Sequence, residues 1–362
     1  MKAIPCPVWR GAHRQLPMGV VALGVGALVG ACGGDTSVDT PGTSAAQSTS
    51  AMMSTSSGPV VNHVHGAVMG VTPSQILLGT HYGLEVSNDL GTTWQPVPSV
   101  AGDSVAAIIR LPTDYVGAFE PMSATGRMAG PAYVMYSSDG QNWTRATGLA
   151  PGSISNLVAA DSGLGAWASV TNVGIFHSVD GGHTWSVVLP TTKILTALEQ
   201  VGRNLVFTTQ DGIEVTSSTG ASMPASPVLT QAMNDMSPWS ACPTCLLATL
   251  ASGDIATSRD AGHTWETTRT GHAFDRVTSF PGLGTTLFGM VAAPVATDQG
   301  LWRSTDTGHT WTSVIKQPNV DGMLDVRGSA PALLAFQWGI TVWRSADAGA
   351  TWARLSSLTG AM

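Results

Sequence analysis

Three histidines lie where two short apolar segments of the chain are expected to meet. His63 and His65 open one predicted strand, and the two-residue alternation of a strand puts both imidazoles on one side. His81 closes the next predicted strand. Three converging imidazoles could hold zinc or copper. Equivalent strand ends elsewhere carry His272, Asp275, Asp321 and Met323, which could face the same place.

A structural role explains the same histidines. The three side chains would then hydrogen-bond to loop carbonyls and stack on Tyr82. Both interpretations stay open at this point. Three further histidines lie inside glycine-containing turns and are expected to be surface turn residues: His183, His263 and His309.

Two of the four cysteines form the short segment Cys242-Pro243-Thr244-Cys245. In an oxidising compartment this spacing predicts a local disulfide in the turn between two strands of one sheet. A thioredoxin-like redox pair would need a helix N-terminus, and a zinc site would need a second pair of ligands. Neither context is visible around Cys242 and Cys245.

The first 31 residues predict an export signal. Basic residues precede an apolar run, residues 16–31, that is too short and too rich in glycine for a membrane span. The run ends in Leu28-Val29-Gly30-Ala31-Cys32, which resembles the lipobox of bacterial lipoproteins. The resemblance implies that Cys32 is lipidated and becomes the new N-terminus. Gly33 stands where many inner-membrane lipoproteins have Asp, so the resemblance favours the outer membrane.

The segment after Cys32 is expected to be a flexible tether. Residues 33–58 contain Gly, Ser, Thr and Ala but no aromatic residue, so they cannot bury enough surface to fold. Beyond the signal, 13 basic residues stand against 23 acidic ones, a net charge of −10. This balance disfavours nucleic acid as a partner. Membrane association is expected to come from the lipid anchor.

A repeat organises the rest of the chain. Six segments share Ser-x-Asp, a glycine turn and Trp, and they begin 39 to 50 residues apart when the degenerate copy Ser217-Ser218-Thr219-Gly220 is counted as a seventh. This period is typical of propeller blades. The aspartate and tryptophan of each full copy are Asp89 and Trp94, Asp139 and Trp143, Asp180 and Trp185, Asp260 and Trp265, Asp306 and Trp311, and Asp347 and Trp352.

The repeat resembles the Asp-box, or bacterial neuraminidase repeat, of sialidases, of the sortilin luminal domain and of the propeller that assists photosystem assembly. The resemblance covers residues 62–357 and implies that these turns are structural and lie away from the central pocket. The opening around His63, His65 and His81 is also similar to that of bacterial propellers labelled glycosyl-hydrolase-like or sialidase-like.

Composition agrees with an all-β fold. Apolar residues make up 43% of the chain, charged residues only 11%, and no long stretch has helical periodicity. We predict a signal peptide over 1–31, a lipidated cysteine and tether over 32–58, and one seven-bladed β-propeller over 59–362, with four antiparallel strands per blade. The ring closes through side-chain packing, unless residues 59–61 add a strand to the last sheet.

The chain lacks a recognisable set of sialidase catalytic residues. Retaining sialidases use three arginines and a tyrosine nucleophile with an acidic partner. The chain has four tyrosines, and the sequence assigns no acidic partner to any of them. Arg110-Leu111-Pro112 follows the first repeat where the family's Arg-Ile-Pro motif should precede it. Other glycoside chemistry would need two carboxylates from the set Asp211, Asp235, Asp275 and Asp321.

These observations favour a non-catalytic binding or assembly platform in the bacterial envelope. Its partner would be an envelope protein or a glycan, and the chain is expected to be a monomer. The alternatives are a sialidase-like glycoside hydrolase, or copper or zinc binding through the histidine cluster. The sequence leaves open whether the fourth blade, which has lost its motif, is degenerate or shaped for contact.

Overall fold

The computed structural model describes residues 64–70, 72–123, 128–161, 163–220, 222–224, 226–291, 299–316, 323–329, 332–337 and 341–357. The predicted signal, tether and lipidation site Cys32 lie outside this range, as do His63 and Asp321. None of the helices in the described residues is long and apolar enough to cross a membrane.

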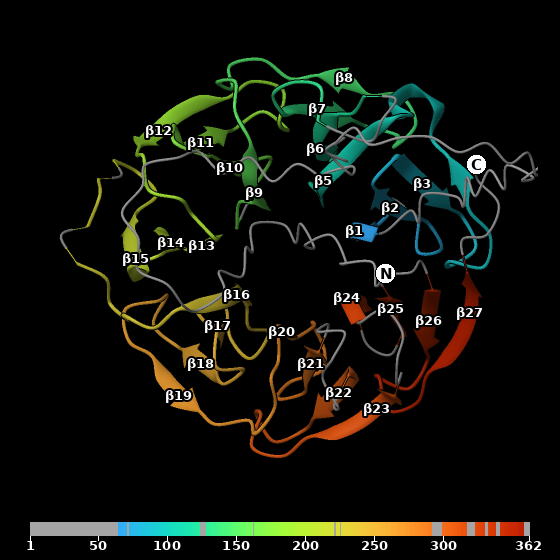
Figure 1. Ribbon diagram of the computed structural model, residues 1–362, viewed down its shortest axis with the longest axis vertical. Coiled ribbons are helices and arrows are strands. Elements are labelled where there is room, and N and C mark those ends of the chain that lie inside the picture. The colour runs from blue at the N-terminus through green and yellow to red at the C-terminus, as the bar shows by residue number, and fades with distance from the viewer. Residues whose placement is uncertain are drawn as a thin grey trace, which may run out of the picture.

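Seven antiparallel sheets are arranged as blades around a centre (Figure 1). Blades one to three consist of β1 (Val64–Met69), β2 (Ile76–Thr80), β3 (Gly83–Ser87) and β4 (Gln95–Pro96); β5 (Asp103–Arg110), β6 (Tyr115–Pro121), β7 (Tyr133–Ser137) and β8 (Thr144–Arg145); and β9 (Ile154–Ala159), β10 (Ala166–Val170), β11 (Gly174–Ser178) and β12 (Ser186–Pro190). A single 3-10 turn, η1 (Pro98–Val100), is the one helical element of the described residues.

Blade four has β13 (Ala197–Val201), β14 (Asn204–Thr209) and β15 (Gly212–Ser217). Blades five to seven consist of β16 (Met233–Pro238), β17 (Leu246–Leu250), β18 (Ile255–Ser258) and β19 (Glu266–Thr268); β20 (Arg276–Thr278), β21 (Leu287–Val291), β22 (Gly300–Ser304) and β23 (Thr312–Lys316); and β24 (Met323–Ser329), β25 (Ala332–Gln337), β26 (Thr341–Ser345) and β27 (Ala353–Ser357). The prediction of an all-β, seven-bladed propeller is therefore confirmed.

Blade four differs from the other six within the described residues. Its sheet has three strands, whereas each of the others has four. The place of the fourth strand is marked by one isolated bridge between Ile213 and Leu229. This is also the blade whose copy of the repeat lacks Asp and Trp.

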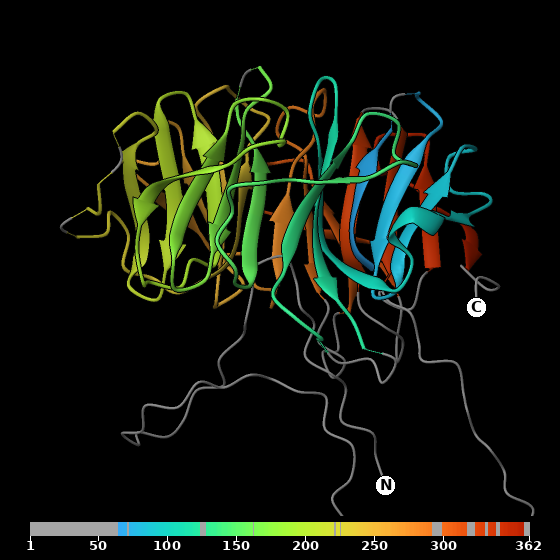
Figure 2. The same ribbon diagram turned by 90° about the horizontal axis from the view of Figure 1, so that it is seen from above.

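The first strand of each blade is the innermost one, and side-on the ring is a flat disc (Figure 2). The hydrophobic core is divided into seven clusters, one at each junction between neighbouring blades. At the junction that closes the ring, Phe336 and Val342 of blade seven pack with Ile76 and Leu78 of blade one. Closure in the described residues thus comes from side-chain packing.

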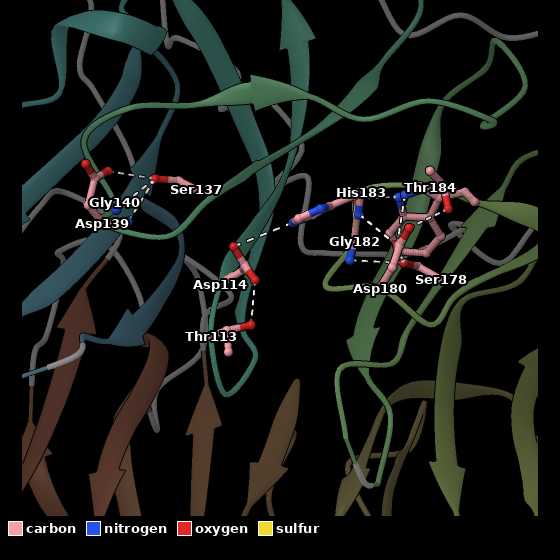
Figure 3. A network of polar contacts seen from close by, with 11 residues as sticks. Thr113, Asp114, Ser137, Asp139, Gly140, Ser178, Asp180, Gly182, His183 and Thr184 are labelled. Atoms are coloured by element: carbon pink, nitrogen blue, oxygen red, sulfur yellow. Dashed lines mark hydrogen bonds and ion pairs between the residues drawn. The ribbon is translucent and has the colours of Figure 1, made fainter.

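The repeated Ser-Asp turns hold their own shape through side-chain bonds to the backbone (Figure 3). In blade three, the Asp180 carboxylate accepts from the Thr184 amide at 2.9 Å, and the Ser178 hydroxyl accepts from the Gly182 amide at 3.0 Å. The Trp185 indole N–H donates to the Gly182 carbonyl at 2.9 Å. A Cβ at Gly182 would lie 2.5 Å from Val116 of blade two, so the turn needs glycine to pack on the preceding blade.

Candidate functional site

The innermost strands begin, and the second strands end, on one face of the ring, which we call the channel face. The histidine-rich ends of β1 and β2 lie there, as the sequence predicted for propeller strands. Five innermost strands carry a β-bulge near this face. Bulges redirect side chains from the regular alternation of a strand. The extra residues are His65, Ala106, Ser155, Asn234 and Leu324.

His65 uses its redirected side chain to join two blades. Its Nδ1 lies 2.9 Å from the carbonyl oxygen of Val105 in β5 and therefore donates to it. Asn156 makes the corresponding bond from blade three, to the carbonyl of Leu195 at 3.3 Å. Asn234 does so from blade five, to the carbonyl of Phe274 at 3.3 Å. His65 therefore performs a structural task that asparagine performs in two other blades.

His81 packs beside His65 at the end of β2. Their ring centroids are 5.6 Å apart in an edge arrangement, and the His81 ring meets that of Tyr82 at 5.3 Å. Burial lowers the pKa of His81, which favours a neutral imidazole. Within the described part of the chain, no group of three or more His, Cys, Asp or Glu could hold a metal ion. His63, the third member of the predicted cluster, lies outside that part.

The other predicted candidates on this face lie at the junction of blades five and six. The His272 ring packs against Trp302 at 4.2 Å and against Phe274 at 5.1 Å. Asp275 is buried, and its backbone N–H bonds to Met290 of β21. His272 is half-buried at this junction, and Asp275 is buried. Asp321 lies outside the described residues.

Two of the aspartates proposed as glycosidase carboxylates are engaged in ion pairs. Asp235 accepts from the Arg276 guanidinium at 2.8 Å, which joins blades five and six. Asp211 lies 3.0 Å from the ammonium group of Lys193, and the same ammonium lies 2.7 Å from the buried carboxylate of Glu214. The hydrogen bonds to Glu214 and Asp211 raise the pKa of Lys193.

One tyrosine has an acidic partner that the sequence did not reveal. The Tyr133 hydroxyl donates to the Asp103 carboxylate, and the Arg145 guanidinium lies 4.1 Å from the centre of the Tyr133 ring. Burial, and then the hydrogen bond to Asp103, raise the pKa of Tyr133. A tyrosine that holds its proton more firmly is a poorer nucleophile. The pair therefore corrects the expectation that no tyrosine has an acidic partner, without supplying sialidase chemistry.

Arginine placement also differs from a sialidase site. The Arg110 guanidinium donates to the carbonyl oxygen of Gly70, just past the end of β1 that lies opposite the channel face. Arg110 thus connects blades one and two at the other face of the ring. Its role is structural, as the order of the Arg110-Leu111-Pro112 segment relative to the first repeat already indicated.

Two buried glutamates were not among the predicted site residues. Burial raises the pKa of Glu85 and that of Glu120 to about 7 each. Leu84 next to Glu85 packs toward blade two, and Phe119 next to Glu120 packs toward blade one. Because neighbours on a strand point to opposite faces, Glu85 points toward blade seven and Glu120 toward blade three. The two carboxyl groups therefore point away from each other and do not form a catalytic pair.

The sulfur atoms of Cys242 and Cys245 form a disulfide, with the two Cα atoms 5.1 Å apart. The bridge lies in the turn between β16 and β17, as the spacing predicted. Thr244 inside the turn donates its hydroxyl to the carbonyl oxygen of Arg259, which ties the turn to the end of β18.

Comparison with known proteins shows that the fold, but not the sequence, resembles that of solved structures. No protein-family model matches the chain, and no curated protein matches it in sequence. Among solved structures, YCF48 bound to D1 peptide has a TM-score of 0.59 at 17% identity over 79% of this chain and 94% of that one. YCF48 from Cyanidioschyzon merolae has a TM-score of 0.59 at 13% identity over 79% of this chain and 96% of that one.

An ancestral GH74 enzyme has a TM-score of 0.53 at 15% identity. The match covers 82% of this chain but only 49% of that enzyme, so the chain spans about half the length of its neighbour. The shared feature is the β-propeller fold. At these identities the likeness carries no residue-level correspondence.

Proposed function

We propose that this protein is an exported, lipid-anchored propeller that binds a protein partner in the bacterial envelope and performs no catalysis. One observation carries the proposal. Two polar side chains near the channel face bond across blades, His65 to Val105 and Asp235 to Arg276. Side chains committed to such bonds hold the ring together and are not arranged as nucleophile, acid and base around one reacting atom.

Two further observations support a binding role. The predicted anchor at Cys32 and the tether over 32–58 would hold a folded body near the membrane while leaving it able to search for a partner. YCF48, which has the same fold, has been solved with a peptide bound. Rigid propellers present fixed surfaces, which suits recognition of another protein.

Affinity capture tests the proposal. The full-length protein, in detergent, would be used as bait for an envelope extract after mild crosslinking, with heat-unfolded bait as the control. We expect one envelope protein to be enriched in stoichiometric amount by the folded bait alone. Recovery of the same proteins with folded and unfolded bait would contradict the proposal.

A metal site is the second candidate function. It is favoured by the 5.6 Å distance between the ring centroids of His65 and His81, and His63 would be its third ligand. Such a site predicts bound zinc or copper that depends on His81 and His63 together. Loss of the bound metal in both His63→Ala and His81→Ala would support this site, and equal metal in parent and variants would exclude it.

A further inference from the structure

The turn that carries the disulfide is held in shape by hydrogen bonds that do not involve sulfur. Inside it, the Trp239 N–H donates to the Cys245 carbonyl at 2.9 Å, and the Cys245 N–H donates to the Cys242 carbonyl at 3.1 Å. The Ser240 N–H donates to the Ser279 hydroxyl of blade six at 2.9 Å. Opening the bridge between the two sulfur atoms would leave these bonds in place.

Two further bonds join this turn to the Ser-Asp turn of the same blade. The Thr244 hydroxyl donates to the Arg259 carbonyl at 2.8 Å, and the Ala261 N–H donates to the Thr244 carbonyl at 2.9 Å. Both turns lie on the face of the ring opposite the channel face, where β16 ends and β17 begins. Because the disulfide closes a loop of only four residues, it constrains the chain little beyond what these bonds already fix.

The two cysteines differ in access. Cys242 is half-buried, and the residues between the cysteines, Pro243 and Thr244, are exposed. Cys245 is 2% exposed and packs with Leu247 in the core cluster at the junction of blades five and six. A thiol arriving from outside attacks the sulfur that it can reach. Cys242 is therefore the sulfur open to attack, and Cys245 is the one that leaves.

Thr244 offers a hydrogen-bond acceptor to a reduced Cys242. The Cys242 Sγ lies 3.6 Å from the Thr244 Oγ1, in a contact that is exposed to solvent. The Thr244 hydroxyl gives its own proton to the Arg259 carbonyl, so its lone pairs are free to accept from a thiol S–H. The turn thus suits the dithiol form of the pair as well as the disulfide.

We propose that Cys242 and Cys245 form a reversible redox pair, which takes two electrons from a dithiol in the envelope while the propeller stays folded. One thiolate of the donor attacks the Cys242 sulfur, the bond between the two protein sulfurs breaks, and Cys245 leaves as a thiolate that takes up a proton. The second thiol of the donor, as its thiolate, then attacks the donor sulfur of the mixed disulfide. Cys242 is released and takes up a proton, and the donor departs as a disulfide.

This inference goes beyond the proposed binding function and does not rest on it. The pair lies in a turn between two strands and not at a helix N-terminus, so its reactivity comes from access to one sulfur and not from a helix dipole. The exchange is stoichiometric, with one electron pair taken up per protein molecule. It is therefore compatible with a protein that performs no catalysis.

Single-cysteine variants test which sulfur is attacked. Cys245→Ser leaves Cys242 as the thiol, and Cys242→Ser leaves Cys245. Each full-length variant would be labelled with N-ethylmaleimide, in native buffer and in urea, and mapped by mass spectrometry. We expect Cys242 to react at least tenfold faster than Cys245 in native buffer and at a similar rate in urea. The reduced parent, labelled in the same way, repeats the comparison without a substitution. Equal native rates would overturn the assignment of Cys242.

Thr244→Val removes the acceptor beside Cys242, whereas Thr244→Ser keeps it. In a redox buffer of reduced and oxidised dithiothreitol, we expect Thr244→Val to shift the equilibrium toward the disulfide by about two- to fivefold and Thr244→Ser to match the parent. The lost bond to Arg259 affects both oxidation states alike, so a merely structural role would not move this equilibrium. Equal equilibria for the parent and Thr244→Val would remove Thr244 from the redox pair.

Reduction of the folded protein decides the inference. The full-length protein, in detergent, would be treated with dithiothreitol with and without unfolding concentrations of urea, quenched with iodoacetamide at intervals and mapped at Cys242 and Cys245. We expect the native rate to lie within about tenfold of the rate in urea, with the circular dichroism of the propeller unchanged. A native rate that is slower than this, or reduction accompanied by loss of the β-sheet signal, would overturn the proposal.

Discussion

Three side chains, one in each of three blades, bond to a backbone carbonyl of the next blade, in its innermost strand or just before it: His65, Asn156 and Asn234. We expect His65→Asn to stay within about 0.5 kcal/mol of the parent in free energy of unfolding, and His65→Ala to lose about 1–2 kcal/mol. Urea unfolding measures both.

Elemental analysis of the same variants gives the independent control. After exposure to zinc and copper and desalting, we expect parent, His65→Asn and His65→Ala to hold the same amount of metal. One equivalent of metal in the parent that disappears in both variants would instead support a site shared by His63, His65 and His81.

Glu120 makes stability depend on pH near neutrality. Burial raises the pKa of Glu120 to about 7, from 4.5 in the unfolded chain. Between these two pH values the native state holds the proton that the unfolded state has released, so stability falls as pH rises. The loss is complete above pH 7 and amounts to at most about 3 kcal/mol.

Replacing the carboxyl group should remove the share of this slope that comes from Glu120 and leave the share that comes from Glu85, whose pKa burial also raises to about 7. We expect Glu120→Gln to be more stable than the parent at pH 8 by roughly 1–3 kcal/mol and nearly equal to it at pH 4, as judged by urea unfolding at each pH. Glu266→Gln, at an exposed position, serves as the control. Parallel pH profiles for the parent and Glu120→Gln would show that Glu120 does not titrate in this way.

For single residues, the sequence revealed the motifs but not which side chains contact each other. The histidines were found because they flank short predicted strands. The pair Tyr133–Asp103 was missed because its members lie 30 residues apart on different strands, where only the fold brings them together. The only sequence sign that Glu85 and Glu120 are buried is that each is a lone carboxyl residue within an apolar run. The same pattern is found where a strand residue faces solvent, so it did not predict burial.

Among the elements, the junction of blades three and four depends on one tryptophan. Trp167 is buried and fills the space that motif turns occupy at other junctions. We expect Trp167→Ala to lower the free energy of unfolding by about 3–5 kcal/mol because it leaves a cavity, and Trp167→Phe to lower it by less. Chemical denaturation measures both. A cost below about 1 kcal/mol for the alanine variant would mean that this junction is not held by Trp167.

The disulfide turn between β16 and β17 gives a second prediction at the scale of elements. Closing a loop of four residues lowers the entropy of the unfolded chain and so raises the free energy of unfolding by about 2 kcal/mol, less than a long loop would. The double variant Cys242→Ser with Cys245→Ser should lower the melting temperature by a few degrees. Reductant should shift the parent toward the variant and leave the variant unchanged; a variant that reductant also destabilises would contradict this origin.

The blade boundaries were predictable because the same turn recurs at nearly the same interval. The three-stranded form of blade four was not, since the motif's loss at Ser217–Gly220 indicates a missing turn but not whether a strand still follows. The sequence also did not show that Trp167 fills the space left by the missing turn, because a tryptophan in a strand does not reveal which neighbouring blade its side chain packs against.

At the scale of the whole molecule, side-chain bonds between blades hold the ring together. The channel face is cross-linked by side-chain bonds between blades, which makes the ring rigid. A rigid ring suits recognition of a partner, because the binding surface needs little ordering when the partner arrives.

The central claim, that this propeller binds without chemistry, is tested most directly by measuring turnover. The full-length protein would be incubated with a broad panel of β-glucans and sialosides, with Asp103→Asn and Tyr133→Phe variants alongside, and product release would be followed. We expect the parent, like both variants, to release no more product than a sample without protein. Sustained turnover by the parent that disappears in Asp103→Asn would contradict it.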